Sequence, residues 1–127
     1  MTTHARGTFE VTITPDEPVD GIGRFRLEKT WSGDLAGRGR GLMLSAGDPA
    51  RQKAGYVALE TFEGSLGGVS GAFAFQQLGV MRPDAQDLTY LVVPGSGTGD
   101  LAELDGTLTL DISADGTHTY ELTYTLE

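Results

Sequence analysis

The chain contains no cysteine, and this absence removes several classes of site together. Its 127 residues offer no thiol to form a disulfide, to bind a metal as a thiolate or to act as a nucleophile. With only two histidines in addition, we expect no high-affinity transition-metal site and no cofactor. A chain without cysteine is compatible with a reducing compartment, so we expect a cytoplasmic protein.

Long apolar runs and an excess of basic residues are missing as well. No segment approaches the roughly 20 apolar residues of a membrane span, and no apolar stretch follows residues 1–6, so we expect neither an anchor nor a signal peptide. Nine Lys and Arg residues stand against eighteen Asp and Glu, a net charge of −9. Because that charge repels phosphates and anionic lipids, we expect neither nucleic acid nor a membrane as a partner.

A sustained helical period is also absent. The best helical candidate, residues 48–53, has a capping Asp and a first-turn Pro, but its length favours a single turn in a loop. Glycine, by contrast, is abundant: 19 residues, with bursts of aromatic and β-branched residues between them. This profile is typical of a turn-rich all-β protein, and the length is that of a single domain covering residues 1–127.

One short phrase of Gly, Leu and acidic or small residues occurs three times, roughly every 31 to 35 residues, at 31–37, 62–68 and 97–103. That interval is close to two strands plus their connections, so every second turn of a β-meander would carry the phrase. All three turns would then lie at one end of the same sheet. We predict two-residue turns at 35–36, 66–67 and 101–102.

These turns predict which residues face each other on neighbouring strands. The resulting register pairs Trp31 with Arg40, Lys29 with Leu42, Glu60 with Phe73, Tyr56 with Gln77 and Val93 with Leu110. For the last hairpin we predict a three-residue loop with Gly116 as its left-handed residue, because this loop pairs Leu110 with Tyr120 and keeps the apolar faces together.

Alternating apolar and polar residues mark eight strands, most plainly at 117–126. Eight antiparallel strands with one apolar face and no helix to cover it must close on themselves or form a sandwich. Successive hairpins favour closure into an eight-stranded antiparallel up-and-down barrel. A barrel has an interior, which is where we look for a site.

Two charged residues are predicted to face that interior. Lys29 and Glu60 each stand six residues before the Leu of their own repeat, so they share a height and are separated by the strand that carries Leu42. Each needs a partner, because an isolated buried charge costs several kcal/mol. Either they form an ion pair without functional meaning, or Glu60 takes a proton while Lys29 stabilises negative charge, the two catalytic roles we assign as candidates.

Aromatic residues with polar tips suit a small-molecule pocket, because they bury area and still offer hydrogen bonds. Our candidate ligand-binding residues are Tyr56, Gln77, Tyr120, Trp31, Phe75 and Tyr124. His118 is also predicted on the inner face, close enough to the last turn to be a rim residue.

Three functions are compatible with such a barrel. The leading hypothesis is an isomerase or cyclase that confines a small, largely apolar molecule. The second is a non-catalytic carrier with the same pocket. The third is a structural module whose interior is filled by aromatic side chains, namely Phe9, Trp31, Phe62, Phe73 and Phe75.

Two glycine-rich segments invite other assignments. Residues 94–99 resemble a phosphate-binding loop, but no helix follows them and no Lys stands where a Walker loop needs it. Residues 37–41 resemble an RNA-binding box, but their alternating glycines more simply let a strand bend or admit the bulk of Trp31. We also find no serine elbow followed by a helix.

The opposite face of the predicted sheet carries unexpectedly many apolar residues, namely Val57, Leu59, Leu88, Tyr90 and Val92. An exposed apolar patch usually marks a partner, most economically a second copy of the chain. We therefore predict a homo-oligomer, in the simplest case a homodimer.

Several segments together resemble the bacterial family of domain of unknown function 3224, at residues 31–35, 56–60, 70–73, 92–99, 101–106 and 120–124. The resemblance runs in order over nearly the whole chain. It implies an eight-stranded barrel similar to that of allene oxide cyclase, with an apolar ligand in the lumen, but no established reaction. Glu60 and Lys29 match the family's pattern, whereas Gln77 replaces a His that the family often has there.

Overall fold

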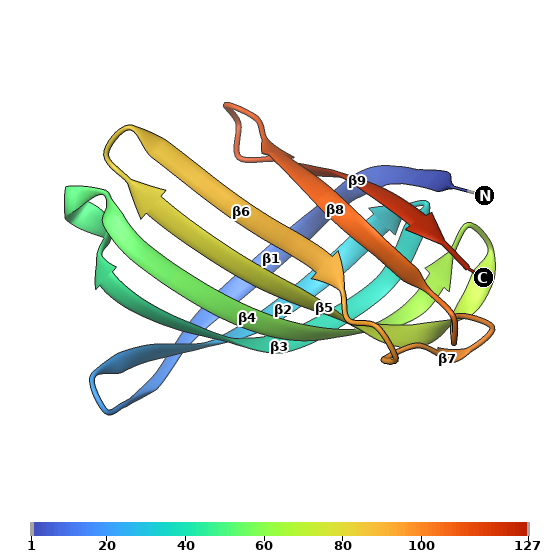
Figure 1. Cartoon of the computed structure of the whole chain (residues 1–127), viewed down its shortest axis with the longest axis horizontal. Helices are drawn as coiled ribbons and strands as arrows, with labels where there is room; N and C mark the ends of the chain where they lie inside the picture. Colours follow the sequence, from blue (N-terminus) through green and yellow to red (C-terminus); the bar gives the residue numbers. More distant parts are fainter. Residues whose placement is uncertain (1, 127) are drawn as a thin grey trace.

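Antiparallel strands make up almost all of the computed structural model, which describes residues 2–126 (Figure 1). The strands are β1 (Thr3–Val19), β2 (Ile22–Gly33), β3 (Leu35–Asp48), β4 (Lys53–Leu66), β5 (Val69–Arg82), β6 (Ala85–Val92), β7 (Thr98–Gly99), β8 (Asp105–Ile112) and β9 (His118–Thr125). A single 3-10 turn, η1 (Pro49–Arg51), joins β3 to β4, as expected for this loop, and Asp48 caps it by accepting from the Ala50 N–H at 3.1 Å. Among residues 2–126, no helix is long and apolar enough to cross a membrane.

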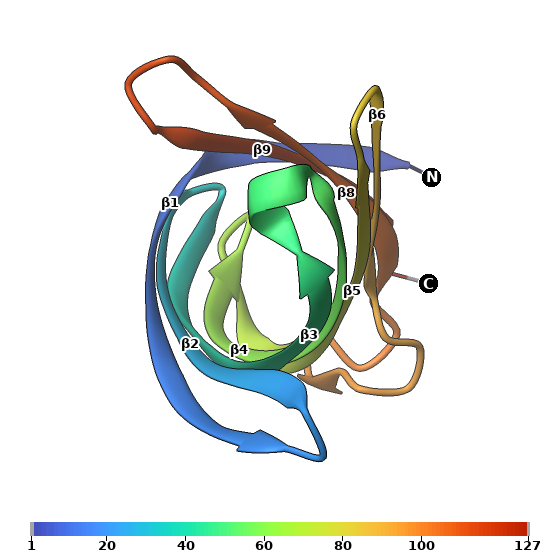
Figure 2. The ribbon, with the colours of Figure 1, turned by 90° about the vertical axis from the view of Figure 1, so that its left-hand side faces the viewer.

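Eight of these strands form a closed ring, which Figure 2 shows end-on. Each of β1 to β5 pairs with the next strand, β6 pairs with β8, β8 with β9, and β9 with β1. The two-residue β7 pairs with Gly71 and Ala72, near the start of β5. The predicted eight-stranded up-and-down barrel is therefore confirmed.

The repeated phrase marks one end of this barrel, on the right in Figure 1. The β2–β3 turn and the β4–β5 turn are bonded to each other there, because the Gly67 N–H donates to the Asp34 carbonyl at 2.9 Å. Residues 93–104, which connect β6 to β8, lie at the same end, as do the start of β1 and the end of β9. The prediction that the three copies share one end is confirmed.

The predicted position of the first turn is wrong. The β2–β3 turn centres on Asp34 instead of residues 35–36, so Lys29 pairs with Gly39 and Trp31 with Gly37. Gly33 adopts a φ of +106°, which a side chain would resist, so the chain reverses there and Leu35 is buried in the core. This odd-numbered shift turns Leu42 outward, where it is 49% exposed.

The second turn is also displaced, but by one position. Gly67 and Gly68 both have positive φ, +58° and +86°, which favours a two-residue turn of the primed kind at exactly these residues. Glu60 therefore pairs with Phe75, instead of Phe73, and Tyr56 with Gly79, instead of Gln77. Because the pairing slips by two residues, the side chains keep their predicted faces.

The third copy does not form a tight hairpin. Strand β6 ends at Val92, and residues 93–104 make an irregular connection from which Leu101 and Leu104 insert into the core. The predicted pairing of Val93 with Leu110 is wrong. In β6 the buried side chains are Tyr90 and Val92, at 3% and 0% exposure, so these two do not belong to the outer face as predicted.

The last hairpin is as predicted. Leu110 pairs with Tyr120, and Gly116 has a φ of +89° in the loop between β8 and β9. The Asp115 carboxylate accepts from the Ser113 hydroxyl and from the Thr117 N–H, which closes the loop. These hydrogen bonds lower the pKa of Asp115 to about 2.

The outer face of β3, β4 and β5 carries a continuous apolar patch. Val57 and Leu59 lie on it as predicted, and the complete patch is formed by Leu42, Leu44, Val57, Leu59 and Leu78. Leu42 pairs with Leu59, and Val57 lies between Leu44 and Leu78. The homodimer stays a prediction.

Candidate functional site

The barrel interior has two halves. The half nearer the repeated turns, which we call the closed half, is filled with side chains. Trp31 stacks on Phe75 with ring centroids 5.3 Å apart, and Phe73 meets Phe75 edge-on at 4.9 Å. The remaining residues of the closed half are apolar or aromatic, namely Leu35, Phe62, Leu66, Leu101, Leu104, Tyr120, Leu122 and Tyr124. Part of the lumen therefore matches the filled-interior hypothesis.

The other half, the open half, contains a cavity of about 230 Å³, which we call the lumen cavity. Its lining is mostly apolar and comprises Phe9, Val11, Ile13, Leu27, Lys29, Met43, Tyr56, Gln77, Tyr90, Leu110, Ile112 and His118. Ile13 and Ile112 are about half exposed, so the cavity reaches solvent at the end away from the repeated turns. The floor of the cavity is formed by Lys29 and Tyr90.

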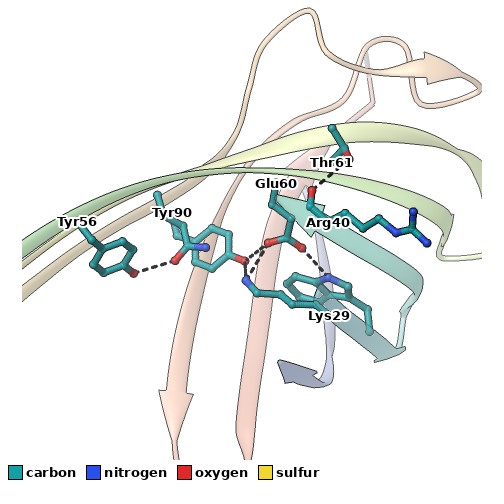
Figure 3. A network of polar contacts seen from close by, with 8 residues as sticks. Lys29, Arg40, Tyr56, Glu60, Thr61 and Tyr90 are labelled. Carbon is teal, nitrogen blue, oxygen red and sulfur yellow. Dashed lines mark hydrogen bonds and ion pairs between the residues drawn. The ribbon is translucent and has the colours of Figure 1, made fainter. Parts of the chain in front are cut away.

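Lys29 and Glu60 meet at the boundary between the two halves (Figure 3). Lys29 Nζ lies 2.8 Å from Glu60 Oε1 and donates to the Tyr90 hydroxyl at 2.9 Å. The second carboxylate oxygen, Glu60 Oε2, accepts from Trp31 Nε1 at 2.9 Å. Both charged side chains are buried, so the predicted ion pair exists and is part of a four-residue network.

Glycines on β3 make room for this network. Lys29 pairs with Gly39, and Glu60 with Gly41, so the strand between the two charged residues presents no inward side chain at these positions. A Cβ on Gly39 would collide with Glu60 Oε2 and lie 3.0 Å from Trp31 Nε1. One of the two roles expected for these alternating glycines, room for Trp31, is thereby confirmed.

Burial governs the protonation of the network. Desolvation lowers the pKa of Lys29, although the nearby Glu60 carboxylate favours the charged ammonium and opposes that effect. Desolvation together with the negative charge of Glu60 raises the pKa of Tyr90 well above its usual 10.0. Tyr90 is therefore a neutral hydrogen-bonding group at physiological pH.

A second polar pair lies farther up the cavity wall. The Tyr56 hydroxyl donates to Gln77 Oε1 at 2.8 Å (Figure 3). Gly79, which pairs with Tyr56 across β4 and β5, leaves room for the tyrosine ring. Burial raises the pKa of Tyr56, so this hydroxyl also stays protonated.

The structure separates the sequence-predicted site residues into two groups. Lys29, Tyr56 and Gln77 line the lumen cavity, whereas Glu60 lies behind Lys29 and does not reach the wall. The other four candidates belong to the closed half, namely Trp31, Phe75, Tyr120 and Tyr124.

Tyr120 illustrates a structural role in place of the predicted ligand contact. Its hydroxyl accepts from the Leu35 N–H at 2.9 Å and donates to the Ser32 carbonyl at 3.0 Å. It thereby ties β9 to the turn between β2 and β3. An aromatic residue with a polar tip can satisfy buried backbone groups as well as a ligand, so residue type alone did not separate the two roles.

Sequence reasoning missed Tyr90, the residue that shares the cavity floor with Lys29. Residues 90–93 are all apolar or aromatic, so the pattern does not say which alternate set faces inward. His118 is half-buried at the cavity edge, stacked on Phe9 with centroids 4.9 Å apart, in agreement with its expected rim position. Among residues 2–126, no group of three or more His, Asp or Glu side chains is arranged to hold a metal ion.

Comparison with known proteins supports the family. The family model described as "Protein of unknown function (DUF3224)" matches residues 5–124. A crystal structure of a protein with unknown function from the DUF3224 family of Shewanella oneidensis MR-1 is similar, with a TM-score of 0.91 and 39% identity over 100% of this chain and 98% of that chain. No curated protein matches the chain. The likeness to allene oxide cyclase stays a prediction.

Proposed function

Because the chain belongs to the DUF3224 family, whose description states no function, we propose one from the barrel's geometry: the open half binds a small, largely apolar molecule. The observation that carries the proposal is the lumen cavity of about 230 Å³ with its apolar walls. An apolar cavity of ~150 Å³ holds benzene, so this one suits a ligand of about ten non-hydrogen atoms.

Packing elsewhere in the same barrel supports this proposal. Protein interiors are normally close-packed, and the closed half follows that rule, with Trp31 edge-on to Phe62 and stacked on Phe75. The open half leaves its apolar walls in contact with solvent. Covering such walls with an apolar molecule is favourable, since it removes apolar surface from water.

The test places a bulky side chain on the inner face of β3, where it fills the cavity, and compares it with the same side chain on the outer face. Met43 lines the lumen cavity, whereas its neighbour Leu42 points outward. Isothermal titration with ethylbenzene should show binding to the wild type and to Leu42→Trp, and a loss of roughly tenfold or more in Met43→Trp. Wild-type protein that binds no ethylbenzene, or Met43→Trp that binds it unchanged, would contradict the proposal.

Native mass spectrometry of the purified protein addresses the natural ligand directly. A molecule of about ten non-hydrogen atoms that remains bound in the wild type and is lost in Met43→Trp would identify it. The Leu42→Trp variant is again the matched control, because its new side chain faces solvent.

The second candidate function is an isomerase or cyclase that uses the same cavity. The observation that favours it is the hydrogen-bonded pair of Lys29 and Tyr90 on the cavity floor. An ammonium group there would stabilise negative charge that develops on a ligand oxygen, and confinement would hold the ligand in a reactive conformation. Lys29 would contact the ligand, and Glu60 would position Lys29 in place of the role as base predicted for it.

This candidate is tested with acetophenone, whose methyl protons exchange with D₂O when a solvent base removes one of them and the resulting enolate oxygen is stabilised. Proton NMR should show faster exchange with wild-type protein than in buffer. Glu60→Gln should lower that rate by about 10²-fold while leaving the dissociation constant for acetophenone within roughly threefold. Binding without any exchange above the buffer rate would point to a carrier.

A further inference from the structure

The floor of the lumen cavity offers a hydrogen-bond donor. A lysine ammonium has three N–H groups. Two of them are directed at Glu60 Oε1 and at the Tyr90 hydroxyl. One donor remains on Lys29, which lines the cavity with Nζ 4.7 Å from the centre of the Phe9 ring, itself part of the wall.

The acceptors at this floor are already occupied. The Tyr90 hydroxyl oxygen accepts from Lys29, and its own proton is directed at Glu60 Oε1 at 3.4 Å. Glu60 in turn accepts from Lys29 and Trp31 and does not line the cavity. A ligand atom that reaches the floor therefore finds a donor.

Gln77 presents the same polarity higher on the wall. Its carboxamide oxygen accepts from the Tyr56 hydroxyl, so the amino group carries the remaining hydrogen-bonding capacity. Gln77 is buried and lines the cavity, and within residues 2–126 its Nε2 donates to no protein acceptor. The Lys29 ammonium and the Gln77 amino group thus both suit an acceptor on the ligand.

Charge narrows the class of possible ligands further. The positive Lys29 and the negative Glu60 cancel, and no Asp, Glu or Arg side chain of the described residues lines the cavity wall. A carboxylate at the floor would add a second negative charge beside Glu60, and an ammonium would meet Lys29. Either would bury a charge without its own partner, which is costly.

From these observations we infer that the ligand is a neutral molecule whose polar atoms are acceptors, such as a ketone, an ester or a lactone. Its oxygen takes the third N–H of Lys29 while its carbon skeleton covers the apolar wall. This inference rests on the proposed binding function and names the class of ligand for that same cavity.

A matched series of aromatic probes tests it on the wild-type protein by isothermal titration at pH 7. Acetophenone, benzoate, benzylamine and ethylbenzene have nearly the same size and differ in polarity and charge. Acetophenone should bind at least about tenfold more tightly than benzoate or benzylamine, and several-fold more tightly than ethylbenzene.

Each contrary result has a distinct meaning. Benzoate or benzylamine binding as tightly as acetophenone would overturn the neutral-ligand inference. Ethylbenzene matching acetophenone would overturn the acceptor while leaving the apolar binding function in place. Failure of all four probes to bind would refute the proposed function itself.

Variants locate the preference within the cavity. Gln77→Leu should leave the preference for acetophenone over ethylbenzene in place, because the single oxygen of acetophenone accepts from Lys29. Lys29→Met alone would leave Glu60 as a buried charge without a partner. The double variant Lys29→Met/Glu60→Gln therefore removes both charges, and near-ultraviolet circular dichroism is the control for folding. In it acetophenone and ethylbenzene should bind alike, and a retained preference for acetophenone would overturn the inference.

Discussion

The two halves of the lumen are built from the same strands, but side chains fill one half and leave a cavity in the other. In the closed half, Phe62, Phe75 and Leu101 are fully buried, and the irregular connection after β6 plugs the end of the barrel. In the open half, mostly apolar side chains surround a cavity of about 230 Å³. One end of the barrel is therefore filled by its own side chains, and the other contains the space in which we propose that a ligand binds. The network of Lys29, Glu60, Tyr90 and Trp31 separates them.

The largest expected effect contrasts the packing of the two halves. Phe62→Ala should lower the free energy of unfolding by about 4 kcal/mol, because it leaves a cavity in the closed half. Ile13→Ala, at a half-exposed position of the open half, should cost below about 1 kcal/mol. Urea denaturation measures both, and equal losses would remove the distinction between the halves.

Breaking the boundary ion pair comes next. Lys29→Met should destabilise the protein by about 3 kcal/mol at pH 7, because Glu60 keeps a buried charge without its partner. The double variant Lys29→Met/Glu60→Gln should recover most of that loss, since no unpaired charge remains. Equal stability of the single and the double variant would show that the pair is not coupled.

A glycine substitution tests the space reserved for this boundary. Gly39→Ala should cost about 2 kcal/mol, because the added methyl group collides with Glu60 Oε2. Gly55→Ala in β4 is the matched control, since its Cβ would meet only the Gly79 carbonyl at an ordinary 3.5 Å. The control should be neutral or slightly stabilising. Thermal denaturation of both variants measures these changes in stability. A Gly39→Ala variant as stable as the wild type would contradict the close approach of Gly39 to Glu60.

The smallest effect concerns alkaline pH. The pKa of Tyr90 is raised above 10.0 in the folded protein, so the unfolded chain loses this proton first and the stability falls as pH rises above about 10. Tyr90→Phe should therefore reduce the decline by up to about 1.4 kcal/mol per pH unit above pH 10. The lowered pKa of Lys29 acts in the opposite direction in both proteins, because the unfolded chain then holds the extra proton. Chemical denaturation at pH 9 and 11 measures the difference, and parallel declines would contradict it.

The barrel and its ion pair could be predicted from the sequence, although two of the three predicted turns were misplaced and the third is an irregular connection. Lys29 and Glu60 hold the same position in two copies of a repeat, and the bond between Gly67 and Asp34 keeps those copies level in the structure. Their meeting therefore depends on the repeat and not on the exact turn. The position of the β2–β3 turn depends on which glycine takes a positive φ, and the sequence around Gly33 contains several glycines.

The cavity could not be predicted in the same way. Tyr90 lies in a segment that is apolar on both faces, so its orientation depends on the long connection after β6 and not on local alternation. Trp31, Phe75, Tyr120 and Tyr124 have the residue types of a ligand pocket and instead fill the closed half. Which end of a barrel is packed depends on how residues from distant strands combine, and no single strand contains that information.

Both ends of the described chain lie at the closed end, where Thr3 on β1 pairs with Tyr124 on β9 (Figure 1). An affinity tag or a surface linker attached at either terminus would thus sit on the far side from the cavity entrance. Immobilised through such a tag, the barrel would present its opening to the solution. A sensor for the small neutral molecules that we propose as ligands could be assembled on this scaffold without redesigning its entrance.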